Sequence, residues 1–254
     1  MIQDERYQRI YDILKERQSV TVHFLKNYLY ASEATIRRDL EAMESRGLLR
    51  RVWGGAAAVG TEKDTPDFVR IRTNIDKKEK IGRIAAKLIR DSSTLFIDSS
   101  TTCLSVIPYL STKKNLTIVT SSLKMSKILG EQTTANIHIL GGQIYEKNIV
   151  TGLAAIDSIR HYHTDLFFLS CSGVSLKAGF TSIEPKVVEV DREMMAHTTT
   201  VCMLCDTTKV GKHSLLRLAS LDRPDYVIMD SVPDDPGLVA ALGDRLITNV
   251  SQLS

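Results

Sequence analysis

A pair of adjacent arginines stands near the start of a short amphipathic segment, and this segment constrains the fold more than any other. Residues 32–38 read Ser-Glu-Ala-Thr-Ile-Arg-Arg. Ser32 has the hydroxyl favoured at the N-cap of a helix. The apolar positions follow at the i, i+4 and i+7 spacing of a buried helix face and are Ile36, Leu40 and Met43. The segment therefore predicts a helix to about Ser45 whose outward side chains include Thr35, Arg37, Arg38 and Glu41.

The flanking segments predict two further helices and a hairpin. One helix is expected from Asp4 to about Arg17, and a short second one begins after the N-cap Thr21. A tight turn at residues 30–31 precedes the third helix, which Arg46-Gly47 ends. Residues 48–53 have strand character, and the following Gly54-Gly55 permits the positive-φ turn of a two-stranded wing. This order of elements predicts a winged helix-turn-helix.

The outward residues of the third helix have the chemistry of DNA recognition. An arginine makes two hydrogen bonds to guanine, which discriminate by ~1 to 3 kcal/mol, whereas a hydroxyl or peptide N–H at a helix start suits phosphate. The alternative is that the arginines form an ordinary solvated helix face, but the turn and basic hairpin around them favour DNA binding. The predicted DNA-binding residues are Ser32, Glu33, Thr35, Arg37, Arg38, Arg51, Trp53, Gly54 and Gly55.

Composition excludes several classes of protein. The hydrophobic fraction of 43% and charged fraction of 25% are typical of globular domains, and 33 basic against 30 acidic residues leave a net charge of only +3. Four cysteines are too few for a disulfide framework. The N-terminus does not resemble a secretory signal, and no long apolar run predicts a membrane helix. A cytoplasmic protein is expected.

The remainder of the chain alternates between helical and strand patterns. Residues 59–76 are polar, include Pro66 and predict a connector between a domain at 1–58 and another at 77–254. Helices are expected at residues 77–89, after 101, near 122, at 153–160 and at 187–195. Strands are expected at residues 94–98, 116–120, 137–140, 166–171, 201–206 and 226–230. The predicted fold class is α/β, a winged helix-turn-helix followed by a mostly parallel sheet covered on both faces.

Hydroxyl-rich loops follow several of these strands. In an open parallel sheet, ligands bind at the carboxyl ends of the strands, where helix N-termini supply amide donors to anions. Each loop taken alone is more often only a helix cap, but their repetition favours a phosphate site, with Asp98 available for a sugar hydroxyl. The predicted effector-binding residues are Asp98, Ser99, Ser100, Thr101, Thr102, Thr120, Ser121, Ser122, Gly141, Gly142, Gly152 and Lys209.

Two motifs in the first domain resemble the DeoR family of bacterial transcription regulators. Residues 35–40 read Thr-Ile-Arg-Arg-Asp-Leu, the end of the family's recognition helix. Residues 51–56 read Arg-Val-Trp-Gly-Gly-Ala and are similar to the family's wing, in which histidine stands at the position of Trp53.

The resemblance continues into the second domain. The loops at 98–102 and 120–122 are similar to Asp-Ser-Gly-Thr-Thr and Thr-Asn-Ser in the family, with Ser100 and Ser121 as replacements, and Asp-x-x-Lys-x-Gly stands at 206–211. The resemblance implies a sensor domain that binds phosphorylated sugars and has a fold like that of ribose-phosphate isomerases and CoA-transferases.

Other reactive side chains are predicted to be structural. Cys202 and Cys205 are three apart on a predicted strand, which places them on opposite faces, and no second pair completes a metal site. His161 and His163 are expected to cap helix carbonyls. Glu184 and Glu189 lack a partner at a spacing that defines a reaction. No metal, cofactor or catalytic residue is expected.

Two functions remain open at this point. The first is a DNA-binding repressor of a sugar operon, a homo-oligomer (dimer or tetramer) whose partners are operator DNA and a phosphorylated sugar or similar anion. The second is a sugar-phosphate isomerase or CoA-transferase that carries a DNA-binding appendage. A fold like that of isomerases or CoA-transferases is not evidence for their activity. The sequence therefore favours the first function, and we expect that the protein is not an enzyme.

Overall fold

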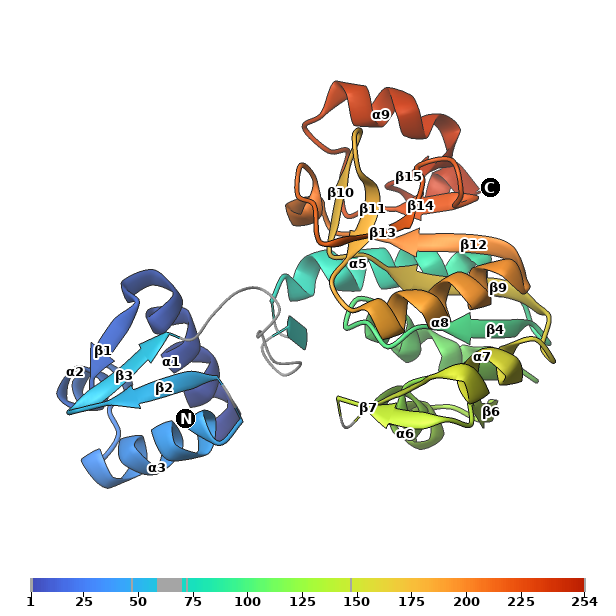
Figure 1. The fold of residues 1–254 in the computed structure, drawn as a ribbon. Helices are drawn as coiled ribbons and strands as arrows, with labels where there is room; N and C mark the ends of the chain where they lie inside the picture. Colours follow the sequence, from blue (N-terminus) through green and yellow to red (C-terminus); the bar gives the residue numbers. More distant parts are fainter. Residues whose placement is uncertain (1, 47, 59–69, 72, 147, 254) are drawn as a thin grey trace. The chain divides into compact units, whose positions relative to one another are not determined.

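The computed structural model describes residues 2–46, 48–58, 70–71, 73–146 and 148–253, which belong to two compact units, Met1–Thr73 and Asn74–Ser254 (Figure 1). Most of the predicted connector, including Pro66, lies outside the described residues, as does Gly47. The predicted order of an N-terminal helix-turn-helix and a mostly parallel sheet is confirmed.

The first unit contains the three predicted helices and a small antiparallel sheet. The helices are α1 (Gln3–Arg17), α2 (Val22–Leu29) and α3 (Glu33–Glu44), and the strands are β1 (Ser19–Thr21), β2 (Leu49–Val52) and β3 (Gly55–Ala58). The sheet order is β1-β3-β2, so the predicted two-stranded wing has a third strand. β1 has only three residues, too few to show an alternating pattern, and its register with β3 pairs Ser19 with Ala57.

A buried ion pair joins α1 to α3. Nε of Arg6 lies 2.7 Å from Oδ2 of Asp39, and Nη2 lies 3.1 Å from Oδ1, so the contact is bidentate. The Asp39 side chain is 2% exposed and that of Arg6 is 15% exposed. Asp39 lies beside the apolar face of α3, where Ile36, Leu40 and Met43 are buried as predicted. The pair therefore fixes the rotation of α3 in its domain.

The second unit is built on one seven-stranded sheet in the order β15-β14-β12-β9-β4-β5-β6, in which every neighbouring pair is parallel. The strands are β4 (Thr94–Ile97), β5 (Thr117–Thr120), β6 (Asn136–Ile139), β9 (Thr164–Ser170), β12 (Thr198–Leu204), β14 (Tyr226–Ile228) and β15 (Leu246–Ile247). All but β15 correspond to predicted strands.

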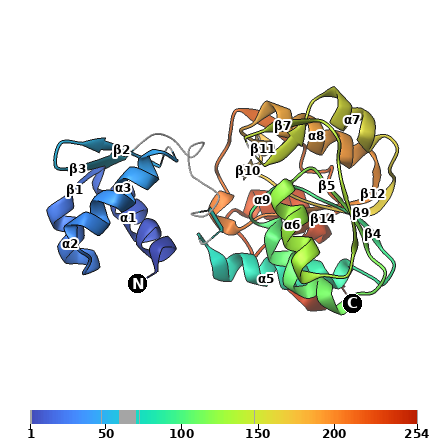
Figure 2. The ribbon, with the colours of Figure 1, turned by 90° about the horizontal axis from the view of Figure 1, so that it is seen from below.

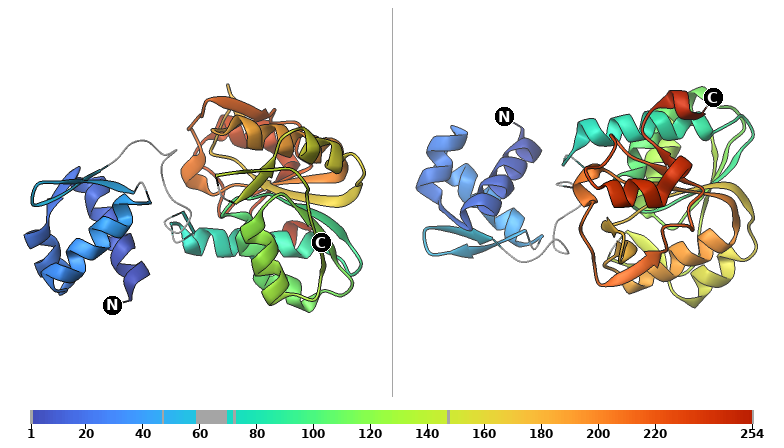
Figure 3. Two further views of the ribbon diagram at one scale, coloured as in Figure 1. Left: turned by 60° about the horizontal axis from the view of Figure 1, so that its bottom comes forward. Right: turned by 90° about the horizontal axis from the view of Figure 1, so that it is seen from above.

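Helices cover both faces of this sheet. One face packs on α5 (Ile75–Ala85), η3 (Cys103–Thr112) and α6 (Leu123–Gln132), and the other on α7 (Leu153–Ile159), α8 (Pro185–Ala196) and α9 (Pro236–Leu242). In Figure 2, and on the left of Figure 3, α5 and α6 lie on the side opposite to α7 and α8. Alternate strand residues enter the two cores, because Phe167 faces one and Phe168 the other.

Several short elements were not predicted. They are α9, the hairpin β7 (Gln143–Tyr145) and β8 (Ile149–Thr151), the antiparallel sheet of β10 (Gly173–Ser175), β11 (Gly179–Ser182) and β13 (Leu216–Ala219), and the 3-10 segments η4 (Thr207–Lys209), η5 (Gly243–Arg245) and η6 (Val250–Leu253). The 3-10 segment η2 (Ala86–Leu88) follows α5 inside the helix predicted at 77–89. The predicted helix after Thr101 is the 3-10 segment η3, which contains Pro108. Within the described ranges, no helix has the length and apolarity to cross a bilayer.

We predict that Asp39→Asn loosens the first unit by about 3 kcal/mol, since it removes one partner of a buried pair and leaves the Arg6 charge unmatched. Hydrogen exchange of α1 and α3 amides, followed by mass spectrometry, should become faster by on the order of a hundred-fold.

Glu5→Gln is the matched control, because Glu5 and Arg9 form an exposed pair 3.5 Å apart. We expect this change to shift exchange by less than about 1 kcal/mol. Equal effects of the two substitutions would contradict the role given to Asp39.

Candidate DNA interface and effector site

The N-terminal end of α3 is capped as the sequence predicts. The Ser32 hydroxyl accepts a hydrogen bond from the main-chain N–H of Thr35 at 3.1 Å and lies 2.8 Å from the Thr35 hydroxyl. Ser32 and Glu33 are exposed, and Thr35 is half-buried. These contacts fix where α3 begins and use the Thr35 N–H, so the remaining first-turn N–H donors are those of Glu33 and Ala34.

The two arginines of α3 are both exposed but differ in their contacts. Nη2 of Arg37 lies 2.7 Å from Oε1 of Glu33, and this hydrogen bond lowers the pKa of Glu33. Arg38 has no ion-pair or hydrogen-bond partner within the described part of the chain. Arg38 can therefore reach an external acceptor directly, whereas Arg37 would first have to leave Glu33, a small change for an exposed pair.

The wing is attached to α3 through Arg51. Its main-chain N–H donates to Oε1 of Glu44 at 2.7 Å, and its guanidinium lies 3.8 Å from Glu44 and 4.0 Å from Glu41. Trp53 at the hairpin turn is fully exposed. The side chain of Trp53 thus has no packing role in the described part of the unit.

The two glycines of the wing are needed for different reasons. Gly54 has a φ of 77°, a conformation that favours glycine, and a Cβ there would meet open space. Gly54 thus supplies the positive φ that the sequence predicts for this turn, whereas Gly55 has none, but a Cβ at Gly55 would lie 2.0 Å from the carbonyl oxygen of Val20. The second glycine is therefore required because β1 crosses close to β3, the strand pairing that the sequence did not reveal.

The predicted effector loops lie at the carboxyl edge of the seven-stranded sheet. Because all its strands are parallel, the residues that follow β4, β5, β6, β9, β12 and β14 reach the same edge. The segments concerned are 98–102, 120–122, 141–142, 170–171, 206–209 and 230. Ser170 and Asp230 were not predicted as part of this edge.

Asp98 holds the first of these loops. It is buried, and its two carboxylate oxygens each accept a main-chain N–H at 2.8 Å, from Ser100 and from Ser170. Burial raises the pKa of Asp98, and the hydrogen bonds that it accepts oppose this shift without cancelling it. Asp98 therefore joins the ends of β4 and β9. The sequence predicted a contact of Asp98 with a sugar hydroxyl but not this structural role.

Three lysines converge on this edge. Nζ of Lys209 lies 2.9 Å from the Ser170 hydroxyl and 3.4 Å from that of Thr102. Nζ of Lys78, a buried residue at 6% exposure, lies 3.2 Å from the Thr101 hydroxyl. Adjacent threonines thus contact two different ammonium groups, which is a suitable environment for an anion.

Lys77 occupies the neighbouring strand end. Its Nζ lies 2.9 Å from Oδ2 of Asp230. Burial raises the pKa of Asp230, but hydrogen bonds from Thr207 and Lys77 outweigh that effect, so the pKa is lowered overall. The sequence predicted Lys77 and Lys78 only as part of a helix, because a polar helix start does not show which of its lysines contacts a distant segment.

The remaining predicted residues form a second group. Ser122 caps α6 by accepting the N–H of Met125 at 3.2 Å, and Gly152, with a φ of 91°, precedes α7. β8 links them, since the N–H of Val150 donates to the carbonyl of Ser121 at 2.7 Å and Gly142 packs against Thr151. No hydrogen bond among the described residues joins this group to the group of Asp98, Thr102 and Lys209.

The other reactive side chains have structural surroundings. All four cysteines are buried, Cys202 and Cys205 face opposite cores as predicted, and the sulfurs of Cys171 and Cys205 lie 3.7 Å apart. Glu184 accepts a hydrogen bond from the Tyr145 hydroxyl at 2.6 Å, which raises the pKa of Tyr145 to about 12. His163 contacts the Thr199 hydroxyl at 3.3 Å rather than a helix carbonyl, contrary to the prediction.

Family models match both units. Residues 6–62 match the DeoR-like helix-turn-helix domain, and residues 73–231 match the DeoR C terminal sensor domain. The chain is 30% identical to the HTH-type transcriptional repressor GlcR of Bacillus subtilis, covering 92% of this chain and 91% of that one. It is also 30% identical to the glycerol-3-phosphate regulon repressor of Escherichia coli, covering 92% and 93%.

Similarities to solved structures are more distant. A ribose 5-phosphate isomerase from Methanocaldococcus jannaschii has a TM-score of 0.39 at 16% identity, covering 54% of this chain and 55% of that one. The initiation factor eIF-2B of Pyrococcus horikoshii has a TM-score of 0.44 at 12% identity, covering 84% and 74%. Nothing about activity follows from these values.

We predict that Gly55→Ala separates β1 from β3 and lowers the stability of the first unit by about 1 to 3 kcal/mol, as overpacking does. Gly54→Asn is the matched control, because asparagine tolerates a positive φ and finds open space there. Thermal unfolding followed by circular dichroism would check this, and an alanine at 55 that is tolerated as well as an asparagine at 54 would refute it.

Proposed function

The chain belongs to the DeoR family of transcription regulators, and we propose that it is a repressor whose α3 and wing read operator DNA under the control of a phosphorylated sugar or a similar anion. The proposal includes the DNA-binding and the effector-binding residues that the sequence analysis predicted. A cytoplasmic location follows from it, since operator DNA lies there.

The exposed face of α3 carries the DNA-binding part of the proposal. This face presents the capped helix start at Ser32, the half-buried Thr35 and Arg38, which has no partner among the residues that the structure describes. The buried Arg6–Asp39 pair holds α3 in one orientation, which makes these groups a rigid set. Such a set suits the major groove, where side chains near the start of a recognition helix reach base edges.

The wing would supply contacts beside the helix. Arg51 is attached to Glu44 of α3, so wing and helix move as one body. The exposed Trp53 offers a flat apolar surface to a sugar or base edge. Together α3 and the wing provide base readout and positioning on the backbone.

The carboxyl edge of the sheet supports the effector part. Lys78 and Lys209 lie on the hydroxyls of Thr101 and Thr102, so a phosphate placed there would meet two ammonium groups and two hydroxyls. The relatives include a repressor whose name refers to a glycerol-3-phosphate regulon, which supports a small phosphorylated effector.

Control of DNA binding requires more than one copy of the chain. Paired reading heads must match the separation of operator half-sites, and an effector that favours one arrangement of subunits changes that match. We therefore propose a homo-oligomer, a dimer or a tetramer. No turnover of the effector is part of the proposal, in keeping with relatives that are transcription regulators.

We predict that Arg37→Ala combined with Arg38→Ala lowers operator affinity by at least about 30-fold, through loss of two base contacts worth about 1 to 3 kcal/mol each. A gel-shift titration with DNA from upstream of the gene would measure this at fixed salt. The control removes two positive charges elsewhere, by Arg9→Ala with Lys15→Ala on the exposed surface of α1. If both double variants lose affinity equally, α3 is not the reading helix.

We predict that Lys209→Met abolishes the thermal stabilisation of the full chain by the effector and leaves operator affinity within about two-fold. Glucose 6-phosphate, fructose 6-phosphate and glycerol 3-phosphate are suitable probes, since a ligand at about 100 times its Kd stabilises by about 2.7 kcal/mol. Lys177→Met, a change at an exposed lysine away from this edge, is the control. Unchanged stabilisation of the Lys209 variant would place the effector elsewhere.

A further inference from the structure

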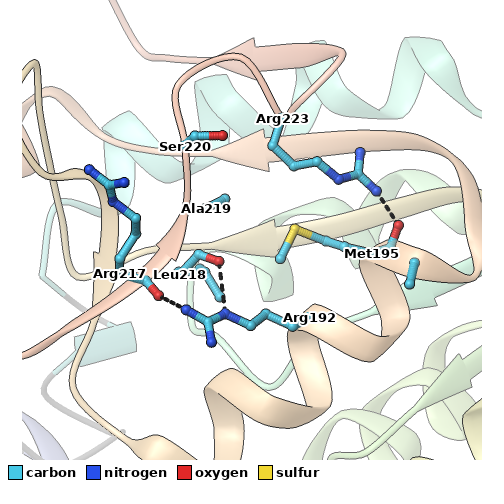
Figure 4. Close-up of a pocket in the computed structure, with 8 residues that line it drawn as sticks. Arg192, Met195, Arg217, Leu218, Ala219, Ser220 and Arg223 are labelled. Carbon is cyan, nitrogen blue, oxygen red and sulfur yellow. Dashed lines mark hydrogen bonds between the residues drawn. The ribbon is translucent and has the colours of Figure 1, made fainter.

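A cavity of about 420 Å³ lies between α8 and β13, away from the effector loops. It is lined by Arg192, Met195, Ala196, Arg217, Leu218, Ala219, Ser220 and Arg223 (Figure 4). The last turn of α8 leads into β12 and the Ser220–Arg223 turn leads into β14, so both lie toward the amino edge of the sheet. The cavity is therefore separate from the carboxyl edge, where Lys209 lies.

The floor of this cavity is apolar and its surroundings are cationic. Met195, Leu218 and Ala219 are buried, whereas the three arginines are exposed. In Figure 4, Met195 and Leu218 lie between Arg192 on one side and Arg223 on the other. The arginines come from α8, β13 and the turn before β14, so the sheet and helix packing brings together three charges that are far apart in sequence.

Main-chain carbonyls, rather than carboxylates, hold these arginines. Arg192 donates to the carbonyls of Leu218, at 3.4 Å, and of Arg217. Arg217 donates to Ala178 at 3.0 Å and to Lys177 at 3.3 Å, and Arg223 donates to Met195. Each guanidinium has five N–H donors, so these bonds leave most of the donors for another acceptor.

Two of the nearby acidic groups, Glu193 and Asp225, are engaged away from the cavity. Glu193, the neighbour of Arg192 in sequence, lies 2.8 Å from Arg160 and 3.3 Å from His197. Asp225 accepts the main-chain N–H of Val201 at 2.8 Å. Asp222 accepts a hydrogen bond from Ser220, which lines the cavity. Within the described part of the chain, no carboxylate lies within 4.0 Å of any of the three guanidinium groups, so the three positive charges around the hollow have no direct ion pair.

We propose that this cavity is a second ligand site, for a small organic anion that carries a phosphate or carboxylate group. The guanidinium groups would bind the anionic group, for which their planar donors are suited, and the buried floor would contact the carbon skeleton. Because carbonyls already fix the arginines, little side-chain entropy is lost on binding. The volume is that of a site for a small metabolite.

Calorimetric titration of the full chain tests this proposal, with pyrophosphate and glycerol 3-phosphate as probes and ionic strength held constant with KCl. The titration is made in the Lys209→Met background, which removes the proposed effector site, so a failure of that site does not affect the result. We expect one site per chain for at least one probe. Arg217→Gln with Arg223→Gln should weaken that binding by at least about ten-fold.

Arg245→Gln is the matched control, because Arg245 also donates to two carbonyls, of Leu221 at 2.6 Å and of Ala241 at 2.8 Å, but does not line the cavity. This variant should bind the probe as its parent does. Equal binding by the double variant, or no binding by the Lys209→Met parent, would overturn the proposal.

Sedimentation velocity tests a second explanation of the arginine cluster, in which it contacts another copy of the chain. If the double variant changes the oligomeric state and neither it nor the parent binds a probe, the arginines serve acidic side chains of a second copy, and the proposal is overturned. Retention of Arg192 in every variant keeps its bonds to β13, so the comparison remains one between folded chains.

Discussion

A parallel sheet that is buried on both faces has to place its polar chemistry at its ends. The seven strands here satisfy their main-chain groups with one another, and the helices on each side close two apolar cores. Side chains able to bind a ligand can then stand only where strands begin or end. At the carboxyl edge these are hydroxyls and the ammonium groups of Lys78 and Lys209. Toward the amino edge they are arginines tied to carbonyls.

In the first unit a single ion pair fixes the orientation of a helix. Three short helices bury a small core, and such a core gives limited control over the rotation of each helix. The bidentate contact between Arg6 and Asp39 adds a directional constraint at the face where α3 meets α1. The adjacent Arg38 is thereby exposed in a defined direction, so a buried pair sets the position of a surface residue.

Periodic segments were predictable from sequence, whereas contacts made by short or distant segments were not. The i, i+4, i+7 spacing of Ile36, Leu40 and Met43 defined α3 because burial on one face leaves that pattern. β1 has three residues and no such pattern, and its pairing with β3 is what requires Gly55. At the effector edge, the loop at Asp98 was visible as hydroxyls after an apolar strand. Lys78 was not, because only the packing of α5 on η3 brings it to Thr101.

Trp53 makes the intrinsic fluorescence of the protein a probe of the wing. It is the single tryptophan of the sequence, and its indole is fully exposed at the tip of the wing. Its emission is therefore that of an indole in water, and unfolding changes that environment little. A ligand that covers the wing removes water from the indole and so changes its emission directly. The intrinsic fluorescence of this chain consequently reports on occupancy of one surface rather than on folding.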